Sequence, residues 1–343
     1  MRIALDATYS VDAQPSGIAV YSRELLDGLS SIYPQDDFVR CYRIKQFFRS
    51  PKPGARNVKR RILWPGFNVF GADVFHALNQ RVDQREAPRV VSTFHDLFVI
   101  SGEYSKPEFR KRFAQQARRA AEQSDLIIAV SEFTADQVSS LLNVERGRIR
   151  VIAHGVHSPL PTQERAREKV VLFVGALQAR KNVERLLEAF ESLPATWRLV
   201  LAGAPSGYRA SEILDRIEAS RSRERIEVTG YVSRERLDDL YTRASIFAFP
   251  SLDEGFGIPV LEAMAWGIPV ITSNGSALAE LGRGVALLVD PRQVGEIASA
   301  LINLAENEDL REKLIRAGQL RAAEFTWEKA IRRTYQVYQE LSS

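Results

Sequence analysis

Glu254 and Glu262 are separated by seven residues, and the turn between them contains Gly255 and Gly257. The apolar run at residues 245–249 predicts a buried strand before this turn, and a proline suited to the first turn of a helix follows it. Glycines let the backbone come close to a ligand, and the free N–H groups and dipole of a helix N-terminus attract an anion. The sequence therefore predicts an anion-binding turn between two carboxylates.

Glu262 is predicted to lie on an apolar face of the helix that follows the turn. Its neighbours three and four positions away are Ile258, Pro259, Ala265 and Trp266, none of which is polar. Burying an unpaired carboxylate costs several kcal/mol, so this side chain needs a partner. A ligand, a structural arginine and partial exposure to water are the alternatives, and this segment alone leaves them open.

Other residues that could act on a ligand follow predicted strands. Arg180 and Lys181 come after the strand predicted at Lys169–Val174, where adjacent cations suit a diphosphate; a solvated pair is the alternative. His95 ends a predicted strand and is expected to face a cleft, unless it is a satisfied core histidine. Gly17 precedes a predicted helix and either brings backbone N–H groups against a phosphate or forms a plain turn.

Strand-like and helix-like stretches alternate along both halves of the chain, which predicts parallel strands joined by crossover helices. In the first half the predicted strands are Arg2–Ala7, Asp73–Ala77, Arg89–Phe94, Leu126–Val130 and Arg150–Ile152. In the second half they are Lys169–Val174, Trp197–Ala202, Arg225–Val228, Ser245–Phe249, Pro269–Ser273 and Val285–Val289. We therefore predict an α/β protein of two doubly wound, Rossmann-like domains whose facing strand ends make a central cleft.

The predicted domains are joined by a polar, proline-rich segment, Ser158–Thr162, which is typical of a linker. We expect a first domain at residues 1–158, a second at residues 159–325, and a C-terminal helix within residues 326–343. The sequence contains neither GxGxxG nor GxxxxGK, which disfavours an ordinary NAD enzyme or nucleotide hydrolase.

The composition is that of an ordinary soluble globular protein, with 343 residues, 45% hydrophobic and 26% charged. Its single cysteine, Cys41, can form no intrachain disulfide and supplies no zinc cluster, which favours a reducing compartment. A charge lies within the first apolar residues, and no apolar run is long enough to cross a bilayer. We therefore expect a cytoplasmic protein that is not an integral membrane protein.

The basic residues are concentrated in the first half of the chain. Residues 1–160 contain 23 lysines and arginines against 17 aspartates and glutamates, whereas residues 161–343 contain 24 against 26. The segment Arg49–Arg61 and an amphipathic helix predicted at Lys106–Glu122 hold many of these cations. Such a helix can dock weakly on an anionic membrane surface, although a solvated face is the alternative. No nucleic-acid partner is expected.

Taken together, these segments resemble the retaining GT-B glycosyltransferases of family 4, also called group 1, over nearly the whole chain. The matching segments are Gly17, His95-Asp96, Ser131-Glu132-Phe133-Thr134, Gly175 with Arg180-Lys181, Gly230-Tyr231-Val232, and Glu254 with Glu262 around Gly255-Phe256-Gly257. The last matches the family's E-x7-E signature, and the order and spacing of all six make the resemblance specific. One departure is His154-Gly155-Val156-His157, where many relatives carry Asn-Gly-Val-Asp, so these two histidines are left out of the predicted site.

The resemblance implies a nucleotide-sugar donor held mainly by the second domain. Arg180 and Lys181 would neutralise the donor diphosphate, and Glu262 would accept hydrogen bonds from the ribose hydroxyls. Glu254 would hold hydroxyls of the donor sugar together with backbone amides of the turn beside it. The residues of that turn expected to bind the donor are Gly255, Phe256, Gly257 and Ile258.

The resemblance also assigns roles outside this turn. The backbone of Tyr231 and Val232 would meet the nucleobase, His95 would contact the sugar from the acceptor side, and Gly17 would lie near the diphosphate. A C-terminal helix beginning near Trp327 would cross back to the first domain. The residues expected to act in catalysis are His95, Arg180, Lys181 and Glu254.

The implied reaction transfers a hexose with retention, without a metal and without a cofactor other than the donor substrate. The segments around His95 and Arg180 are similar to those of bacterial mannosyltransferases, so the expected donor is GDP-mannose. The expected acceptor is a saccharide or a lipid-linked saccharide in the synthesis of cell-surface polysaccharide. Alternatives are a UDP-sugar-dependent glycosyltransferase, a sugar-nucleotide 2-epimerase and a non-catalytic partner subunit that binds a sugar nucleotide.

Overall fold

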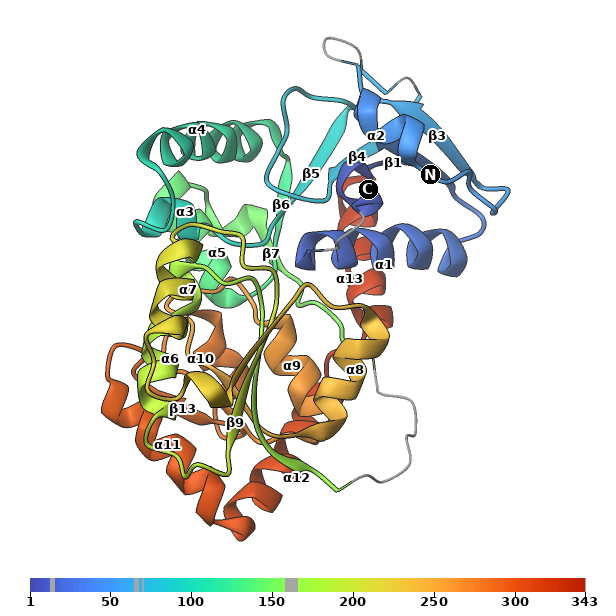
Figure 1. Ribbon diagram of the computed structural model, residues 1–343. Helices are drawn as coiled ribbons and strands as arrows, with labels where there is room; N and C mark the ends of the chain where they lie inside the picture. Colours follow the sequence, from blue (N-terminus) through green and yellow to red (C-terminus); the bar gives the residue numbers. More distant parts are fainter. Residues whose placement is uncertain (13–15, 65–67, 70, 158–165, 343) are drawn as a thin grey trace. The chain divides into compact units, whose positions relative to one another are not determined.

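The computed structural model describes residues 1–12, 16–64, 68–69, 71–157 and 166–342 (Figure 1). The chain divides into two units, and each is described by itself: Met1–Gly155 with Thr326–Ser343, and Val156–Phe325. The predicted boundary between residues 158 and 159 and the predicted linker Ser158–Thr162 lie outside the described residues.

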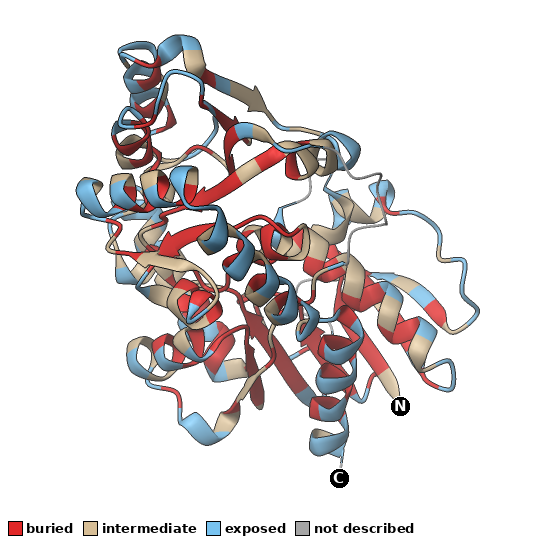
Figure 2. Cartoon of the chain, turned by 90° about the horizontal axis from the view of Figure 1, so that it is seen from below, coloured by how far each residue is buried: buried red, intermediate tan, exposed pale blue. Residues whose placement is uncertain are grey.

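The first unit contains a parallel sheet with the strand order β3-β2-β1-β4-β5-β6-β7 in the described part of the chain. The strands are β1 (Arg2–Asp6), β2 (Asp37–Tyr42), β3 (Val58–Ile62), β4 (Val74–Ala77), β5 (Arg89–Phe94), β6 (Leu126–Ala129) and β7 (Ile149–Val151). The helices are α1 (Gly17–Ile32), α2 (Ile44–Arg49), α3 (Phe98–Ser101), α4 (Pro107–Gln123), α5 (Glu132–Leu142) and α13 (Trp327–Ser342). Figure 2 shows buried strands beside helices that have one buried and one exposed side, as expected for a parallel sheet covered by helices.

The C-terminal helix α13 is part of the core of the first unit. Ile331 lies so close to α1 that a Cβ added to Gly28 would come within 2.1 Å of its Cδ1 atom. The hydroxyl of Tyr338 lies 2.6 Å from Nδ1 of His76 on β4, and the hydroxyl of Tyr335 donates to Asp36 at 2.5 Å. Apolar packing and buried hydrogen bonds therefore both hold α13 in this unit.

Two strands of the first unit were not predicted. β2 precedes the basic stretch Arg49–Arg61, which begins at the end of α2 and contains most of β3. β3 forms the edge of the sheet and has the sequence VKRRI, in which cations occupy the exposed positions. Cations are common on edge strands because they oppose pairing with other chains, and they hide the apolar signal of the strand. The five predicted strands of this half are confirmed to within about one residue at each end.

The second unit contains a parallel sheet with the order β10-β9-β8-β11-β12-β13 in the described residues. The strands are β8 (Glu168–Val174), β9 (Arg198–Ala202), β10 (Ile226–Gly230), β11 (Ala244–Phe249), β12 (Val270–Ser273) and β13 (Leu287–Val289). The helices are α6 (Val183–Phe190), α7 (Ala210–Glu218), α8 (Arg234–Arg243), α9 (Ile258–Ala265), α10 (Ser276–Gly282), α11 (Val294–Glu306) and α12 (Glu308–Ala323). All six strands predicted for this half are confirmed, with ends that differ by up to two residues.

The described residues contain no helix that is both long and apolar enough to span a bilayer.

Candidate active site

The residues predicted to bind a diphosphate lie where the strand order of the second sheet reverses. From β8 the chain proceeds outward through β9 and β10, then returns to β11 on the other side of β8 and proceeds through β12 and β13. The loops that leave β8 and β11 are therefore neighbours: Leu252 N donates to the carbonyl of Arg180 at 2.8 Å, and Asn182 donates to the carbonyl of Pro250 at 2.9 Å. Ligands of doubly wound sheets bind at such a switch point, beyond the carboxyl ends of the strands.

Glu254 is the centre of a buried cluster of charges at this point. One of its carboxylate oxygens accepts from Lys181 at 2.6 Å and from the hydroxyl of Ser251 at 2.6 Å, and the other lies 2.7 Å from the Arg180 guanidinium. Burial alone would raise the pKa of the Glu254 carboxyl above its ordinary 4.5, but the two cations outweigh burial and lower the pKa to about 2. Glu254 is therefore ionised at neutral pH, and the cluster carries two positive charges against one negative.

Both cations have further contacts that restrict their positions. Arg180 is buried and also donates to the carbonyl of Asp253, while the ammonium of Lys181 lies 4.6 Å from the centre of the Phe249 ring. A cation over an aromatic face gains electrostatic energy, and a guanidinium held at two acceptors loses rotational freedom. The site therefore presents two cations in fixed places without a bound ligand.

The glycine-containing turn brings the start of α9 to the same place. Gly257 precedes the first residue of α9, Ile258, and has a φ of 119°, a conformation that side chains other than glycine rarely adopt. Phe256 is buried, with its ring 5.9 Å from that of Phe325. The turn of Gly255, Phe256, Gly257 and Ile258 thus joins the buried Glu254 directly to a helix N-terminus, as the sequence predicted.

Glu262 has partners within the chain, so two of the three alternatives that the sequence left open, a structural arginine and partial exposure, describe it in this structure. One oxygen accepts from Arg234 at 2.6 Å and the other from the hydroxyl of Tyr241 at 3.0 Å, both on α8. The side chain keeps 15% of its surface exposed. Burial, followed by the charge of Glu262, raises the pKa of the Tyr241 hydroxyl well above 10, so this hydroxyl stays a proton donor.

The carboxyl ends of three neighbouring strands are joined by glycines. A Cβ added to Gly203, after β9, would come within 2.0 Å of the carbonyl oxygen of Gly175, after β8, and Gly203 also forms a bridge with Gly230 at the end of β10. Tyr231 follows at once with an exposed side chain, and Val232 lies beside it. The structure therefore places this predicted base-binding pair two strands away from the cluster around Glu254.

His95 lies in the first unit and is buried among aromatic rings. Its Nε2 atom lies 2.9 Å from the carbonyl oxygen of Leu78, and its ring stacks on His154 at 5.3 Å, with Tyr21 edge-on at 4.8 Å. Burial lowers the pKa of His95 to about 4 and that of His154 well below 6.5, so both rings are neutral at physiological pH. Sequence reasoning left out His154, and only its place after the last strand of this unit could have indicated the contact.

Two family models match the chain: "Glycosyltransferase Family 4" at residues 17–158 and "Glycosyl transferases group 1" at residues 161–321. The O-antigen chain mannosyltransferase B of Escherichia coli is 31% identical over 284 residues, which are 78% of this chain and 74% of that protein. The chain belongs to glycosyltransferase family 4, group 1. Its predicted membership is confirmed.

Solved structures show the fold of this glycosyltransferase. Sucrose-phosphate synthase from Thermosynechococcus elongatus matches with a TM-score of 0.82 at 20% identity, covering 99% of both chains. Anabaena Alr3699/HepE, solved in complex with UDP-glucose, matches with a TM-score of 0.77 at 17% identity, covering 99% of this chain and all of the other. The predicted GT-B fold, with two Rossmann-like domains, is confirmed.

The first unit of the glycosyltransferase has a pocket of about 440 Å³ at its own switch point, between β1 and β4. Its lining combines aromatic rings, amides and two arginines: Tyr9, Ile18, Asn79, Gln80, Arg81, Phe109, Arg112, Phe113 and Gln116. Asn79 is 4% exposed, and neither polar atom of its amide has a hydrogen-bond partner among the described residues. Buried amides normally have partners, so this one is available to a polar ligand. Gly17, the first residue of α1, precedes the pocket residue Ile18.

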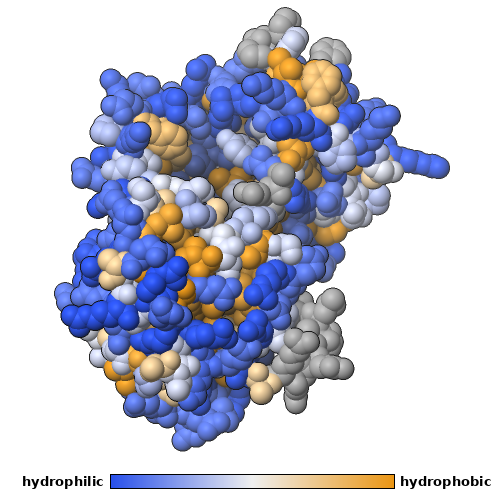
Figure 3. Space-filling view, in the orientation of Figure 1, coloured by the Kyte–Doolittle hydropathy of each residue, from blue (hydrophilic) through white to orange (hydrophobic). Residues whose placement is uncertain are grey.

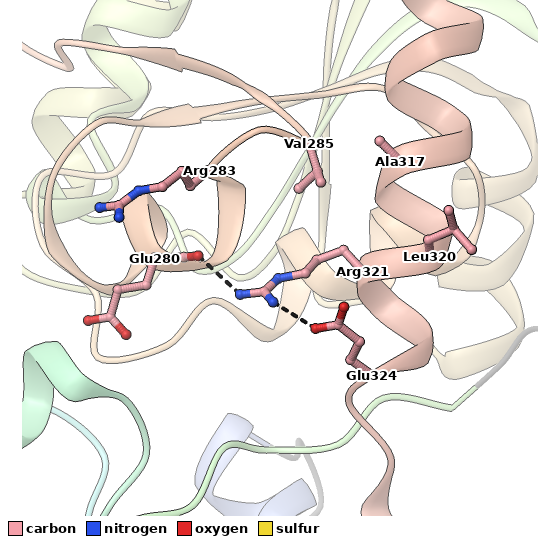
Figure 4. A pocket seen from close by; sticks show the side chains of 7 residues that line it. All are labelled: Glu280, Arg283, Val285, Ala317, Leu320, Arg321 and Glu324. Atoms are coloured by element: carbon pink, nitrogen blue, oxygen red, sulfur yellow. Dashed lines mark hydrogen bonds and ion pairs between the residues drawn. The ribbon is translucent and has the colours of Figure 1, made fainter.

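A second pocket, of about 610 Å³, lies between α10 and α12 in the other unit (Figure 4). Arg321 crosses it and donates to the carbonyl of Glu280 at 3.2 Å and to the carboxylate of Glu324 at 2.7 Å. None of the residues predicted to bind the donor lines it, and we assign it no function.

Proposed function

We propose that this glycosyltransferase transfers mannose from GDP-mannose, with retention and without a metal, to a saccharide or lipid-linked acceptor in the synthesis of cell-surface polysaccharide. The observation that carries the proposal is the cluster of Arg180, Lys181 and Glu254 at the switch point, beside the N-terminus of α9. Two fixed cations and a helix N-terminus suit a diphosphate better than a single phosphate or a neutral ligand.

In this proposal the cluster acts on the leaving group. When the sugar–phosphate bond breaks, negative charge builds on the diphosphate and positive charge on the sugar ring. Arg180, Lys181 and the backbone amides at the start of α9 stabilise the departing charge, and because they are already in place they need no reorganisation. Glu254 stays ionised, holds the cations and accepts hydrogen bonds from donor-sugar hydroxyls.

Retention follows if the acceptor attacks the face from which the diphosphate leaves. A phosphate oxygen of the donor then takes the acceptor proton, so no carboxylate nucleophile is needed. His95 enters this scheme as a neutral group: its Nε2–H donates to the carbonyl of Leu78, so Nδ1 is the atom that accepts a hydrogen bond from the sugar. Its pKa of about 4 makes it a poor proton carrier near pH 7.

The donor is proposed from similarity and from the site. The name of the Escherichia coli relative supports mannose, and GDP-mannose is the donor we propose. The complex of Anabaena HepE with UDP-glucose supports UDP-sugars as the alternative. The backbone of Tyr231 and Val232 is proposed to meet the base, while Glu262, oriented by Arg234, accepts from the ribose hydroxyls.

The pocket of the first unit is the proposed acceptor site. Its aromatic rings suit the apolar faces of a saccharide, and Arg112 suits an anionic group. The amide of Asn79, which has no hydrogen-bond partner in the part of the chain that the structure describes, suits hydroxyls. Such an acceptor is compatible with a cytoplasmic enzyme that makes weak contact with an anionic membrane surface.

Calorimetric titration with GDP and with UDP, in the presence of a metal chelator, tests the donor site. We expect GDP to bind, and Glu262→Gln to weaken it about ten-fold or more because hydrogen bonds to a charged group are lost, whereas binding of UDP instead would favour the UDP-sugar alternative. Glu212→Gln is the matched control, since Glu212 lies in the same unit and is paired with Arg209 on the surface. If neither nucleotide binds, the transferase proposal is contradicted and a different role has to be sought. Turnover of the donor without transfer would favour the 2-epimerase.

A further inference from the structure

A long segment of the first unit carries positive charge only. Between Asp37 and Asp73 the sequence contains nine lysines and arginines and no aspartate or glutamate. Three of the nine are engaged by neighbouring groups: Arg40 binds Asp27, Arg43 binds Asp83, and Arg60 donates to Ser50. The other six are exposed, and none forms an ion pair with a described residue: Lys45, Arg49, Lys52, Arg56, Lys59 and Arg61.

Three large apolar side chains are exposed on the same segment. Phe48 is 78% exposed, Trp64 51% and Ile44 43%. Ile44 and Phe48 are one turn apart on α2 and so share a face. In the register of β2 and β3, Tyr42 pairs with Ile62, and Ile44 and Trp64 each follow this pair by two residues. Trp64 therefore lies at the same end of the sheet as the start of α2.

We call these three apolar residues and six cations the α2–β3 surface. Figure 3 shows hydrophobic side chains at the surface of the region that Figure 1 labels α2 and β3, with hydrophilic ones beside them. A single exposed apolar residue needs no explanation, and cations on the edge strand β3 could serve only to prevent pairing with other chains. Neither reason accounts for Phe48 and Trp64, which are exposed on a segment whose exposed cations form no ion pair with a described residue.

We propose that the α2–β3 surface docks on an anionic lipid bilayer. Aromatic side chains enter the interface between headgroups and acyl chains, and clustered cations attract the lipid phosphates. Apolar insertion and electrostatic attraction are each weak alone, and together they give reversible binding. This surface lies outside the donor site, so failure of the docking proposal would leave the proposed reaction untouched.

The proposed surface differs from the basic helix that the sequence suggested. On α4, Phe109 and Arg112 line the pocket of the first unit, and Arg110 pairs with Glu103. The six cations of the α2–β3 surface have no such pairing among the described residues, so they remain available to lipid phosphates. Glu108 and Glu122 lie among the cations of α4, and its Phe109 is 42% exposed against 78% for Phe48, so charge and aromatic exposure both favour the α2–β3 surface.

Sedimentation of the full-chain protein with vesicles tests the proposal. Vesicles that mix phosphatidylcholine with phosphatidylglycerol should bind it, and phosphatidylcholine alone should bind it much less. Added salt should weaken the binding. Lys45→Gln and Arg49→Gln should each weaken partitioning about five-fold, and Phe48→Ser about ten-fold. Because these side chains are exposed, the circular dichroism spectrum and the urea unfolding of the variants should stay as in the wild type, which shows that the first unit is folded.

Two matched controls separate this surface from others. Leu320→Ser removes an exposed apolar residue of the other unit, and Arg118→Gln with Arg119→Gln removes two exposed cations of α4. Both should bind vesicles like the wild type. The tryptophan emission should shift to the blue on anionic vesicles and lose this shift in Trp64→Phe, because the other three tryptophans are less exposed. Unchanged binding by the α2 variants, equal binding to neutral vesicles, loss of binding in the α4 variant, or binding to polyanions but not to vesicles would each overturn the proposal.

Discussion

Arg234 on α8 donates a 2.6 Å hydrogen bond to Glu262 on α9, from a position 28 residues earlier in the chain. Tyr241, two turns further along α8, donates to the other oxygen of the same carboxylate. Two donors from one helix thus set the orientation of Glu262 without a ligand. Part of the carboxylate still faces solvent, so it can accept further hydrogen bonds from ribose hydroxyls in the proposed reaction.

Replacing Arg234 should therefore weaken nucleotide binding, although Arg234 is proposed to orient Glu262 and not to contact the nucleotide itself. We expect Arg234→Gln to raise the Kd for the bound nucleoside diphosphate about ten-fold, because the carboxylate loses a charged partner that orients it. Calorimetry on this variant and on Arg236→Gln checks this. Arg236 lies on the same helix but pairs with Asp239, so its replacement should change nothing. Equal effects of the two substitutions would show that Arg234 does not act through Glu262.

The ion pairs of Glu254 should make the free energy of unfolding of the second unit depend on pH below about 4.5. The folded pKa of about 2 lies below the ordinary 4.5, so ionised Glu254 stabilises the fold above pH 4.5, and this contribution is lost as the pH falls toward 2. The shift corresponds to about 3 kcal/mol. Urea unfolding at several pH values should show this slope in the wild type and a smaller one in Glu254→Gln. An unchanged slope would mean that another carboxyl group is responsible.

The sequence predicted which segments form strands better than it predicted which strands and side chains lie next to each other. Short continuous apolar runs indicated most of the strands, because the strands of a buried parallel sheet are apolar on both faces. Arg180 and Lys181 were recognised as candidate phosphate ligands, but no spacing indicates that Glu254, more than seventy residues later, accepts from both. That contact depends on β8 and β11 being adjacent, which is a property of the strand order and not of any local pattern.

The residues that the sequence analysis missed are those without a local signal. Arg234 is one of several charged residues in α8, so nothing in the sequence distinguishes it. The fold alone brings it to Glu262 on α9. Asn79 follows β4 in a stretch without a recognisable motif, and its significance depends on the absence of a partner in the described residues. His154 was set aside because it departs from the family pattern, yet its ring stacks on His95. Burial and pairing decide these roles, and neither can be read from residue spacing.

Removing the cation of Lys181 should slow transfer more than it weakens binding. Charge on the diphosphate increases as the bond breaks, so a fixed cation contributes more in the transition state than in the ground state. We expect Lys181→Met to lower kcat about 100-fold, with a smaller effect on the KM for the donor. Lys169→Met, at an exposed position on β8, is the control. A rise in KM at constant kcat would assign Lys181 to ground-state binding alone.

The buried histidines should also make the first unit sensitive to mild acid. The folded pKa of His95, about 4, lies below the ordinary 6.5, so the unfolded chain takes up a proton first as the pH falls. Stability should therefore decrease from pH 6.5 toward pH 4, by about 3 kcal/mol for this residue. Urea unfolding should show a smaller decrease in His95→Gln. NMR titration of the wild-type imidazole is the direct check, and protonation near pH 6.5 would contradict the buried, neutral state.

If the pocket of the first unit binds the acceptor, replacing a residue of its lining should change the KM for the acceptor and leave the reaction of the donor unchanged. Arg112 lines this pocket, lies 5.4 Å from the centre of the Phe109 ring and forms no ion pair with a described residue. If the acceptor carries an anionic group, Arg112→Gln should raise the KM for the acceptor about ten-fold, because a charge-assisted hydrogen bond is lost. Hydrolysis of the donor without acceptor should stay at the wild-type rate, since Arg112 is not among the residues proposed to bind the donor. Arg118→Gln, on the same helix but outside the pocket, should leave both rates unchanged. For an anionic acceptor, an unchanged KM for Arg112→Gln would place the acceptor elsewhere, while donor hydrolysis would still report on the site around Glu254.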